Sequence, residues 1–306
     1  MHVSKNLAYA LMALAAVAWG SSGVLTVLAI DEGASVNEVA LYSEVFSAII
    51  FLVIIGSMEP GAIRIRRRDF LPLLVFSTIT GSLFSVAWYS AIDLTGVTIA
   101  VILLYSYPSW VTVSSIFLHD EKLTYAKAIA LPVTFIGCVL VSGAYDLEMI
   151  RLNALGVGLG LFAAAGATIY YIWVKRWLKV YSAYTIGFYF TVLMIPALIL
   201  ITDPVHTLAP RLSASAWSLV FLLGLIPCTI GFFASMVALK RLEASKASIV
   251  ASLEPVAAVA LAILIIAEEL VWPQAVGVAL VVLGVIILRF AHRDEECIIV
   301  EAPATR

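Results

Sequence analysis

Residues 104–108 read LYSYP, and residues 251–255 read ASLEP, so that a proline recurs at the same place 147 positions later. The same ungapped shift aligns the two halves of the chain well beyond these stretches. It pairs Tyr42 with Tyr189, Ala91 with Ala238, Ala100 with Ala247, Pro108 with Pro255, Glu121 with Glu268 and Gly137 with Gly284. The chain is therefore a duplicated unit.

Each copy contains five long apolar runs. They cover residues 7–30, 36–56, 70–92, 97–118 and 124–144, and then 154–174, 183–202, 215–238, 246–267 and 271–290. The chain is 63% hydrophobic and 12% charged, and a helix needs about 20 apolar residues to cross the hydrocarbon. We predict an all-α integral membrane protein with ten transmembrane helices. Because five crossings reverse the second copy, they form two inverted five-helix repeats, which are typical of secondary transporters.

The predicted domains are a first repeat over 1–148, a second over 149–290 and a flexible cytoplasmic tail over 291–306. The strands of a membrane β-barrel are short segments of alternating polarity, whereas residues 70–92 are apolar on nearly all sides. The sequence therefore indicates helices and not a barrel. The first run also resembles a signal peptide, with Lys5 ahead of it and a small-residue motif at 16–18. The run continues to Ile30, however, and its counterpart in the second repeat, 154–174, lies inside the chain. We therefore interpret it as a transmembrane helix.

The Lys and Arg residues predict the orientation. With ten crossings, 16 of the 18 fall on the side of the N-terminus, and only Arg151 and Arg211 fall on the other. Cytoplasmic loops carry such an excess, which predicts an inner or plasma membrane protein with both termini in the cytoplasm. The net charge of −2 and the purely topological role of the arginines give no reason to expect nucleic acid. The three cysteines lack metal-ligand spacing, and we expect no metal or cofactor.

Two carboxylates lie within the apolar runs. An ionisable residue inside the membrane is a functional candidate by default, and Glu44 and Glu254 both lie about 12 Å deep at 1.5 Å per residue. A protonated packing residue is the alternative for each. Glu44 has Thr191 as its repeat counterpart, and this asymmetry is expected of a group that titrates or contacts substrate. Protons as the coupling ion are therefore a hypothesis.

Prolines interrupt the fourth and ninth runs at equivalent places. Pro255 directly follows Glu254, and it removes the backbone hydrogen bond to the carbonyl of Ala251. Pro108 does the same to the carbonyl of Leu104. Paired interruptions in two repeats indicate the substrate site.

Three aromatic residues, Trp19, Tyr105 and Tyr170, lie deeper than the interfacial belts that tyrosine and tryptophan usually form. A ring at this depth suits a cavity in which its face stacks on an organic ligand or cation. Together with Glu44 and Glu254 they are the predicted substrate-binding residues. The matched acids Glu121 and Glu268 are expected to cap the fifth and tenth helices, with a gating interaction as the alternative.

The quoted motifs resemble those of the EamA-type branch of the drug/metabolite transporter superfamily. The resemblance covers residues from about 7 to 290 and includes the stretches from 104–108 to 121–123 and from 253–256 to 268–270, with Trp19, Gly20 and Ser21 in the first helix. It implies two inverted five-helix repeats, a central cavity lined chiefly by helices 1, 3, 4, 6, 8 and 9, and transport of small metabolites, often outward. Members often carry an arginine in helix 2 near the position of Glu44, so this chain departs toward a cationic or zwitterionic substrate.

The predicted function is secondary transport of a small metabolite by alternating access, with efflux of an amino acid or related metabolite expected first. Uptake of a vitamin-like or other small solute, or drug efflux, is the alternative. An intramembrane enzyme is a remote one, because the chain has no His-Glu-x-x-His run, and we predict no enzymatic activity. A scaffold protein would not need carboxylates at mid-membrane. Ten helices make a complete transport unit, so a monomer is expected, with a dimer open.

Overall fold

The computed structural model describes residues 4–58, 60–119, 121–143, 153–201, 208, 212–266 and 270–290. Within them the regular structure is helical throughout. The predicted tail over 291–306 lies outside the described residues, as does Glu268.

The helices of the first half are α1 (Lys5–Asp31), α2 (Val36–Met58), the 3-10 helix η1 (Pro60–Ile63), α3 (Arg67–Ser77), the π-helix η2 (Thr78–Leu83), α4 (Phe84–Leu104), α5 (Tyr107–His119) and α6 (Tyr125–Val141). Those of the second half are α7 (Ala154–Trp177), α8 (Ala183–Ile201), α10 (Ala214–Leu225), the π-helix η4 (Ile226–Gly231), α11 (Phe232–Leu239), α12 (Ala244–Ala251), α13 (Glu254–Ile266) and α14 (Trp272–Phe290). Among the described residues, nine stretches are long and apolar enough to cross a membrane, and α6 is a shorter apolar helix.

The helix bounds repeat with the period of the sequence. The starts of α2 and α8, of α3 and α10, of α5 and α13, and of α6 and α14 are each 147 residues apart, as are the ends of α4 and α12. The duplication in sequence is thus a duplication in structure. The predicted all-α membrane fold of two inverted five-helix repeats is confirmed.

The structure differs from the prediction inside the third and eighth runs. Each contains one π-helical segment, η2 and η4, in its middle. Pro227 lies in η4 and lacks the N–H that an α-helical turn would use. Around η2, the hydroxyls of Ser77 and Thr80 donate to the carbonyls of Leu73 and Phe76, both at 2.8 Å, and such side-chain bonds loosen and bend helices.

A second difference lies between residues 92 and 97, where the third predicted apolar run ends and the fourth begins. The helix α4 instead continues from the third span, Arg67–Thr95, into the fourth, Ile99–His119.

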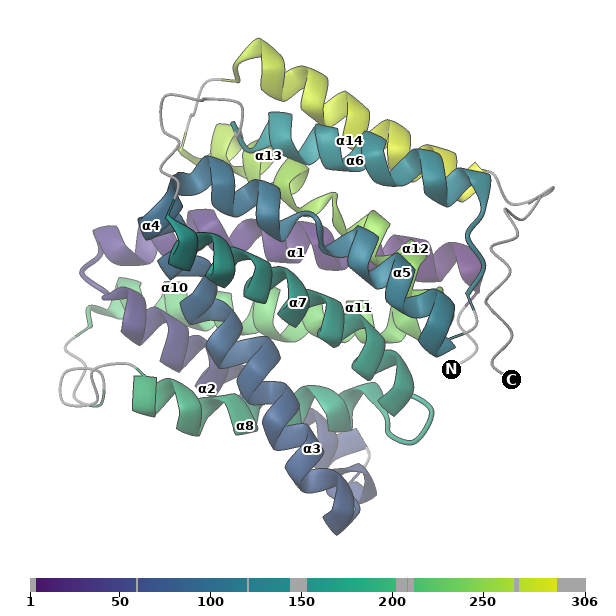
Figure 1. The fold of residues 1–306 in the computed structure, drawn as a ribbon. Coiled ribbons are helices and arrows are strands. Elements are labelled where there is room, and N and C mark those ends of the chain that lie inside the picture. The colour runs from purple at the N-terminus through teal and green to yellow at the C-terminus, as the bar shows by residue number, and fades with distance from the viewer. Residues whose placement is uncertain are drawn as a thin grey trace.

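Figure 1 shows α1 beginning and α14 ending on the same side of the bundle, which we call the terminal side. The pair α6 and α14 lies side by side at one edge, and α2, α3 and α8 lie at the other. Glycines allow the α6–α14 contact, because a Cβ on Gly137 would lie 2.8 Å from the backbone N of Val281 and one on Gly277 2.6 Å from that of Val141. Small residues permit such close approach in membrane helices. Between these edges, α1 packs against α13 and α4 against α7.

Candidate functional site

Two helix interruptions lie at equivalent places in the repeats. The helix α4 ends at Leu104 and α5 begins at Tyr107, while α12 ends at Ala251 and α13 begins at Glu254. Pro108 and Pro255 are the second residues of α5 and α13. Backbone N–H groups in the first turn of a helix have no acceptor within the helix, so proline costs no hydrogen bond there. Each interruption therefore creates a half-helix whose positive N-terminal end lies within the membrane, as in transporter binding sites.

Three rings from different helices form the centre of an aromatic cluster. The centroid of Trp19 lies 6.4 Å from that of Tyr170 and 5.4 Å from that of Phe232, and the last two are 5.5 Å apart, all edge to face. The Tyr170 hydroxyl and Ser235 Oγ share a hydrogen bond of 2.7 Å. Trp19 Nε1 is buried without a hydrogen-bond partner among the described residues. A buried N–H of this kind is a donor that a ligand would satisfy.

Glu254 lies beside the same cluster. It is half-buried and within electrostatic range of Tyr105 and Tyr107, whose rings are 6.5 Å apart. Tyr107 in turn stacks on Tyr171 at 5.7 Å, the neighbour of Tyr170. Close packing of α1 brings Trp19 near this point, since a Cβ on Gly20 would lie 2.7 Å from the Glu254 carbonyl oxygen.

Four of the five predicted substrate-binding residues are thus linked through neighbouring contacts: Trp19, Tyr105, Tyr170 and Glu254. We call these residues, with Tyr107, Tyr171 and Phe232, the aromatic cluster. It offers ring faces and edges, one carboxyl group and two half-helix N-termini. This combination can hold a small organic molecule that carries a positive charge.

Glu44 lies apart, where α2 contacts η4. Its side chain is buried and hydrogen-bonded to the thiol of Cys228, while Oε2 has no partner among the described residues. Nearby, Ser47 Oγ donates to the Cys228 carbonyl at 3.1 Å and Thr229 Oγ1 to Ser47 Oγ at 2.9 Å. The other end of η4 reaches Trp19, because a Cβ on Gly231 would lie 2.9 Å from Trp19 Nε1. The π-helix η4 therefore touches both Glu44 and the aromatic cluster.

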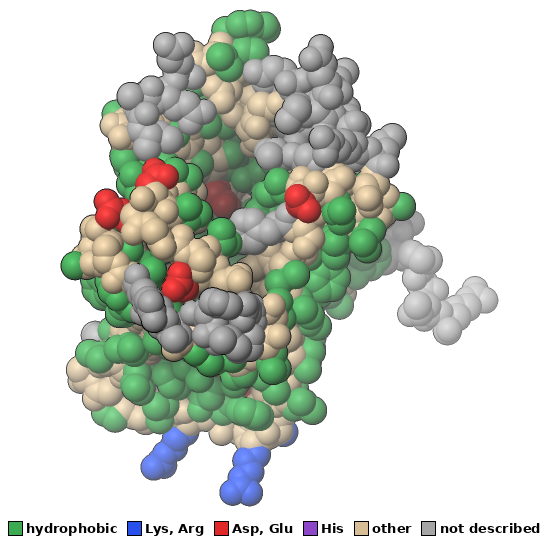
Figure 2. Space-filling view, turned by 90° about the vertical axis from the view of Figure 1, so that its left-hand side faces the viewer, with side chains coloured by type: hydrophobic (Ala, Val, Ile, Leu, Met, Phe, Trp, Pro, Cys, Tyr) green, Lys and Arg blue, Asp and Glu red, His purple; other side chains and the backbone are tan. Residues whose placement is uncertain are grey.

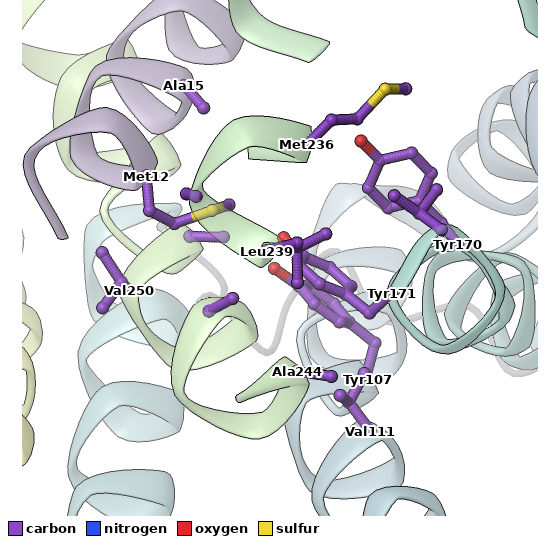
Figure 3. Packing of buried hydrophobic residues seen from close by; sticks show 14 of the residues in the cluster. Met12, Ala15, Tyr107, Val111, Tyr170, Tyr171, Met236, Leu239, Ala244 and Val250 are labelled. Atoms are coloured by element: carbon purple, nitrogen blue, oxygen red, sulfur yellow. The ribbon is translucent and has the colours of Figure 1, made fainter. Parts of the chain in front are cut away.

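Apolar packing closes the terminal side of the cluster. Figure 3 shows Tyr107 and Tyr171 beside Leu239, with Met12 near Val250 on neighbouring helices. All five side chains are at most 5% exposed and belong to one hydrophobic core. A solute in the cluster cannot pass this layer without a rearrangement of α1, α5, α7, α11 and α12.

Charged side chains join the two repeats beyond this layer. Lys127 Nζ lies 2.6 Å from Glu243 Oε2 and 3.6 Å from Glu121 Oε2, and it donates to the Lys122 carbonyl at 2.8 Å. Lys246 pairs with Glu243 at 3.4 Å. We call Glu121, Lys127, Glu243 and Lys246 the ion network. Lys127 is only 1% exposed, and it belongs to the first repeat whereas Glu243 belongs to the second.

The predicted capping role of Glu121 is corrected by this arrangement. Glu121 accepts hydrogen bonds from the backbone N of Ala244 at 2.7 Å and of Ser245 at 3.2 Å, and also from the Ser245 hydroxyl. It therefore caps α12 of the other repeat, while Thr124 caps α6, the fifth crossing. An acid at a helix end stabilises whichever N-terminus the fold brings to it, and sequence adjacency cannot show which one that is.

The ion network also lowers the pKa of Glu243, which precedes α12. Burial by itself would raise the pKa of this carboxyl, but its hydrogen bond and ion pair with Lys127 and its contact with Lys246 lower the pKa below the usual value. The charged form of Glu243 is therefore stabilised in this conformation.

The side opposite the termini has a different character. Among the described residues, Figure 2 shows acidic side chains on this face, Lys and Arg at its lower edge, and a hollow between the helices with an acidic side chain inside it. Asp31, Glu32 and Glu38 lie at the ends of α1 and α2 on this side. The structure is therefore packed shut on the terminal side and hollowed on the opposite one.

The sequence profile of the EamA-like transporter family matches this chain twice, over residues 6–143 and 154–290. The chain belongs to this family. The two matches together span the nine membrane-length stretches of the described residues, the shorter helix α6 and the aromatic cluster, and they agree with the resemblance seen in the motifs. The chain is thus a multi-pass membrane transporter of small solutes.

Several known proteins are similar to this EamA-like transporter. An uncharacterized transporter of Archaeoglobus fulgidus is 28% identical over 72% of this chain and 76% of its own length. A second one from the same organism is 30% identical over 57% of this chain and 61% of its own length. One from Clostridium kluyveri is 25% identical over 56% of both chains. A solved crystal structure superimposes with a TM-score of 0.77 at 18% identity, covering 93% of this chain and 96% of the other. That likeness shows the fold.

The sequence did not single out several residues of this region. Phe232 and Ser235 follow η4, and an apolar run gives no signal that its helix turns these two side chains toward Tyr170. Lys127 and Glu243 looked like ordinary charges at helix ends. The one available signal was the recurrence of Glu121 at the same repeat position as Glu268, which marked the helix end but not the partner.

Proposed function

We propose that this EamA-like transporter exports an amino acid or a related zwitterionic metabolite across the inner or plasma membrane, with both termini in the cytoplasm. The observation that carries the proposal is the carboxyl group of Glu254, which begins a half-helix beside the rings of Tyr105 and Tyr107. This is the chemistry that recognises an ammonium group within a membrane.

Each part of an amino acid has a matching group in the cluster. An ammonium would pair with Glu254 and lie against the rings of Trp19 and Tyr105. A carboxylate would lie at the N-terminal end of α5, because helix N-termini attract anions and the start of α13 already carries Glu254. The Trp19 N–H, which is buried and has no partner within the described part of the chain, is a further donor for it. The basic residues Lys127 and Lys246 lie at the terminal side, beyond the apolar layer, so they do not neutralise Glu254.

Alternating access requires the terminal side to open, and both the ion network and the apolar layer close it here. The structure represents the state in which the ion network and the apolar layer shut the terminal side. To open that side, the contacts of Glu121 with α12 and of Lys127 with Glu243 must part, because they join one repeat to the other. The interruptions before Pro108 and Pro255 let the half-helices α5 and α12 tilt while α4 and α13 keep their packing against α7 and α1.

We propose that Glu44 carries the coupling proton. Its carboxyl is buried at η4, which also contacts Trp19, so a change of its charge alters the element that borders the substrate. Glu44→Gln should abolish transport driven by a pH gradient and leave exchange of substrate for substrate intact. Loss of both activities in folded protein would remove the coupling role.

The substrate chemistry is tested by thermal stabilisation of the purified protein with three matched compounds. These are an amino acid, its N-acetyl derivative without an ammonium, and its decarboxylated amine. The proposal expects stabilisation by the amino acid, less by the amine and none by the N-acetyl compound, with the effect lost in Glu254→Gln. Stabilisation by the N-acetyl compound equal to that by the amino acid would contradict it, and vitamins and drugs would then be tested first. Faster loss of preloaded amino acid from expressing cells would establish export, and faster accumulation would establish uptake.

A further inference from the structure

A separate pocket lies on the terminal side, away from the aromatic cluster. Its volume is about 410 Å³, and its lining residues are Gly61, Arg64, Ile65, Arg66, Val180, Tyr181, Ser182 and Thr185. The first four belong to η1 and the segment before α3, in the first repeat. The others belong to the connection between α7 and α8 and to the start of α8, in the second. The pocket is therefore shared between the repeats.

The lining has the chemistry of an anion site. The guanidinium groups of Arg64 and Arg66 are exposed, and arginine matches the geometry of phosphate oxygens. Ser182 stands at the N-terminal end of α8, where its Oγ accepts from the Thr185 N–H at 3.2 Å and where the helix dipole favours negative charge. The nearby acid, Asp69, accepts a hydrogen bond from the Tyr181 hydroxyl and pairs with Arg68 at 3.9 Å. Its charge is thus partly offset by Arg68, whose side chain is 75% exposed.

The surroundings favour an anion that is attached to an apolar body. Val180 in the pocket is 50% exposed, and Phe70 and Leu71 at the start of α3 are 45% and 64% exposed. These exposed apolar side chains beside two arginines suit a ligand that carries an acyl chain next to its anionic group. Basic pockets between helices on the cytoplasmic side of a membrane recognise anionic headgroups.

We propose that this pocket binds the phosphate group of an anionic phospholipid. The pocket already has direct links between its walls, since the Arg66 N–H donates to the Tyr181 hydroxyl at 3.2 Å and Tyr189 donates to the Ile63 carbonyl at 2.8 Å. A phosphate held by Arg64 and Arg66 and by the start of α8 adds a third link across the repeats. The lipid therefore stabilises the arrangement in which the terminal side is shut.

The test compares lipid retention by native mass spectrometry of the whole protein in detergent. Phosphatidylglycerol is added to the wild type, to the pocket variant Arg64→Gln/Arg66→Gln and to a control, Arg67→Gln/Arg176→Gln, which loses the same charge from residues outside the pocket. We expect retention of one phosphatidylglycerol by the wild type and the control, and about tenfold or more weaker retention by the pocket variant. Phosphatidylcholine should not be retained in the same way.

Each other outcome overturns the proposal. Equal loss from the control and pocket variants would show attraction to surface charge alone. Equal retention of phosphatidylcholine would show that the headgroup is not recognised as an anion. A second arm measures thermal stabilisation by inorganic phosphate in lipid-free detergent. If phosphate stabilises the wild type but not the pocket variant, and phosphatidylglycerol is not retained, the ligand is a soluble phosphate compound and not a lipid.

Discussion

Removal of the buried ammonium of Lys127 should open the terminal side of this transporter. The substitution Lys127→Met keeps an unbranched side chain, one atom shorter, but removes its contacts with Glu121, Glu243 and the Lys122 carbonyl. Because these contacts join the two repeats, the change destabilises the closed terminal side relative to a conformation in which the repeats have parted there.

The expected size follows from the burial of the partners. Removal of one member of a buried ion pair costs about 3–5 kcal/mol. We take the lower end, because the Glu243 side chain is 41% exposed and keeps Lys246 at 3.4 Å, while Glu121 keeps its hydrogen bonds to α12. A change of about 3 kcal/mol corresponds to a roughly 150-fold shift between the two conformations.

The assay is the rate at which a bulky maleimide modifies a cysteine beneath the network. Ala247 in α12 is fully buried, so Ala247→Cys reports opening, in a background where Cys297 is replaced by serine. We expect slow modification in this parent protein and modification faster by up to about 100-fold after Lys127→Met. Lys122→Met is the matched control, because Lys122 is exposed and contributes to the network through its backbone carbonyl. Its rate should equal that of the parent.

An unchanged rate in folded Lys127→Met would refute the reasoning that the network holds the terminal side shut. Size-exclusion chromatography in detergent verifies folding before labelling. If Lys127→Met does not yield folded protein, Glu121→Gln gives the same test, because it weakens the cap on α12 and the pair with Lys127 without the loss of a buried cation.

Three further results are expected. Gly20→Val should lower the midpoint of thermal unfolding, because a Cβ there would lie 2.7 Å from the backbone of α13, whereas Gly23→Val should change it little, since a Cβ there would have no described atom beyond its own helix backbone and chain neighbours within 4 Å; equal effects would contradict the close packing. Tyr170→Phe should lower the free energy of unfolding by about 1 kcal/mol, because it removes the hydrogen bond that the hydroxyl shares with Ser235, and an unchanged unfolding midpoint would contradict a contribution of this bond to stability. The pKa of Glu243 lies below its ordinary value of 4.5 in the folded protein, so its stabilising contribution is present above 4.5 and is lost as the pH falls from that value through the lower folded pKa; unfolding midpoints measured between about pH 6 and 3 should therefore drop more in the parent than in Glu243→Gln.

Much of the fold was predictable because the bilayer imposes strong rules on sequence. The lengths of the apolar runs, the distribution of basic residues and the shift of 147 gave the ten crossings and the inverted repeats. The π-helices η2 and η4 were not predicted, since Pro227 and the hydroxyl residues around Thr80 have the same composition as ordinary packed membrane helices. Packing between helices decides such local distortions.

The candidate site was predicted in part. The depth of Trp19, Tyr105, Tyr170 and Glu254 indicated residues that the fold brings together. Depth alone also grouped Glu44 with them, although it faces Cys228 on η4, because the rotation of a uniformly apolar helix cannot be deduced from its sequence. The partner of Glu121 was likewise hidden, since it comes from the other repeat.

Counterflow in proteoliposomes tests the central claim most directly. Vesicles loaded with unlabelled amino acids and amines are diluted into each labelled compound, and the wild type is compared with Glu254→Gln. We predict that the wild type accumulates a labelled zwitterionic amino acid and that Glu254→Gln does not. Absence of accumulation of every amino acid by folded wild-type protein, or equal accumulation by Glu254→Gln, would contradict the claim that this carboxyl group recognises an amino acid substrate.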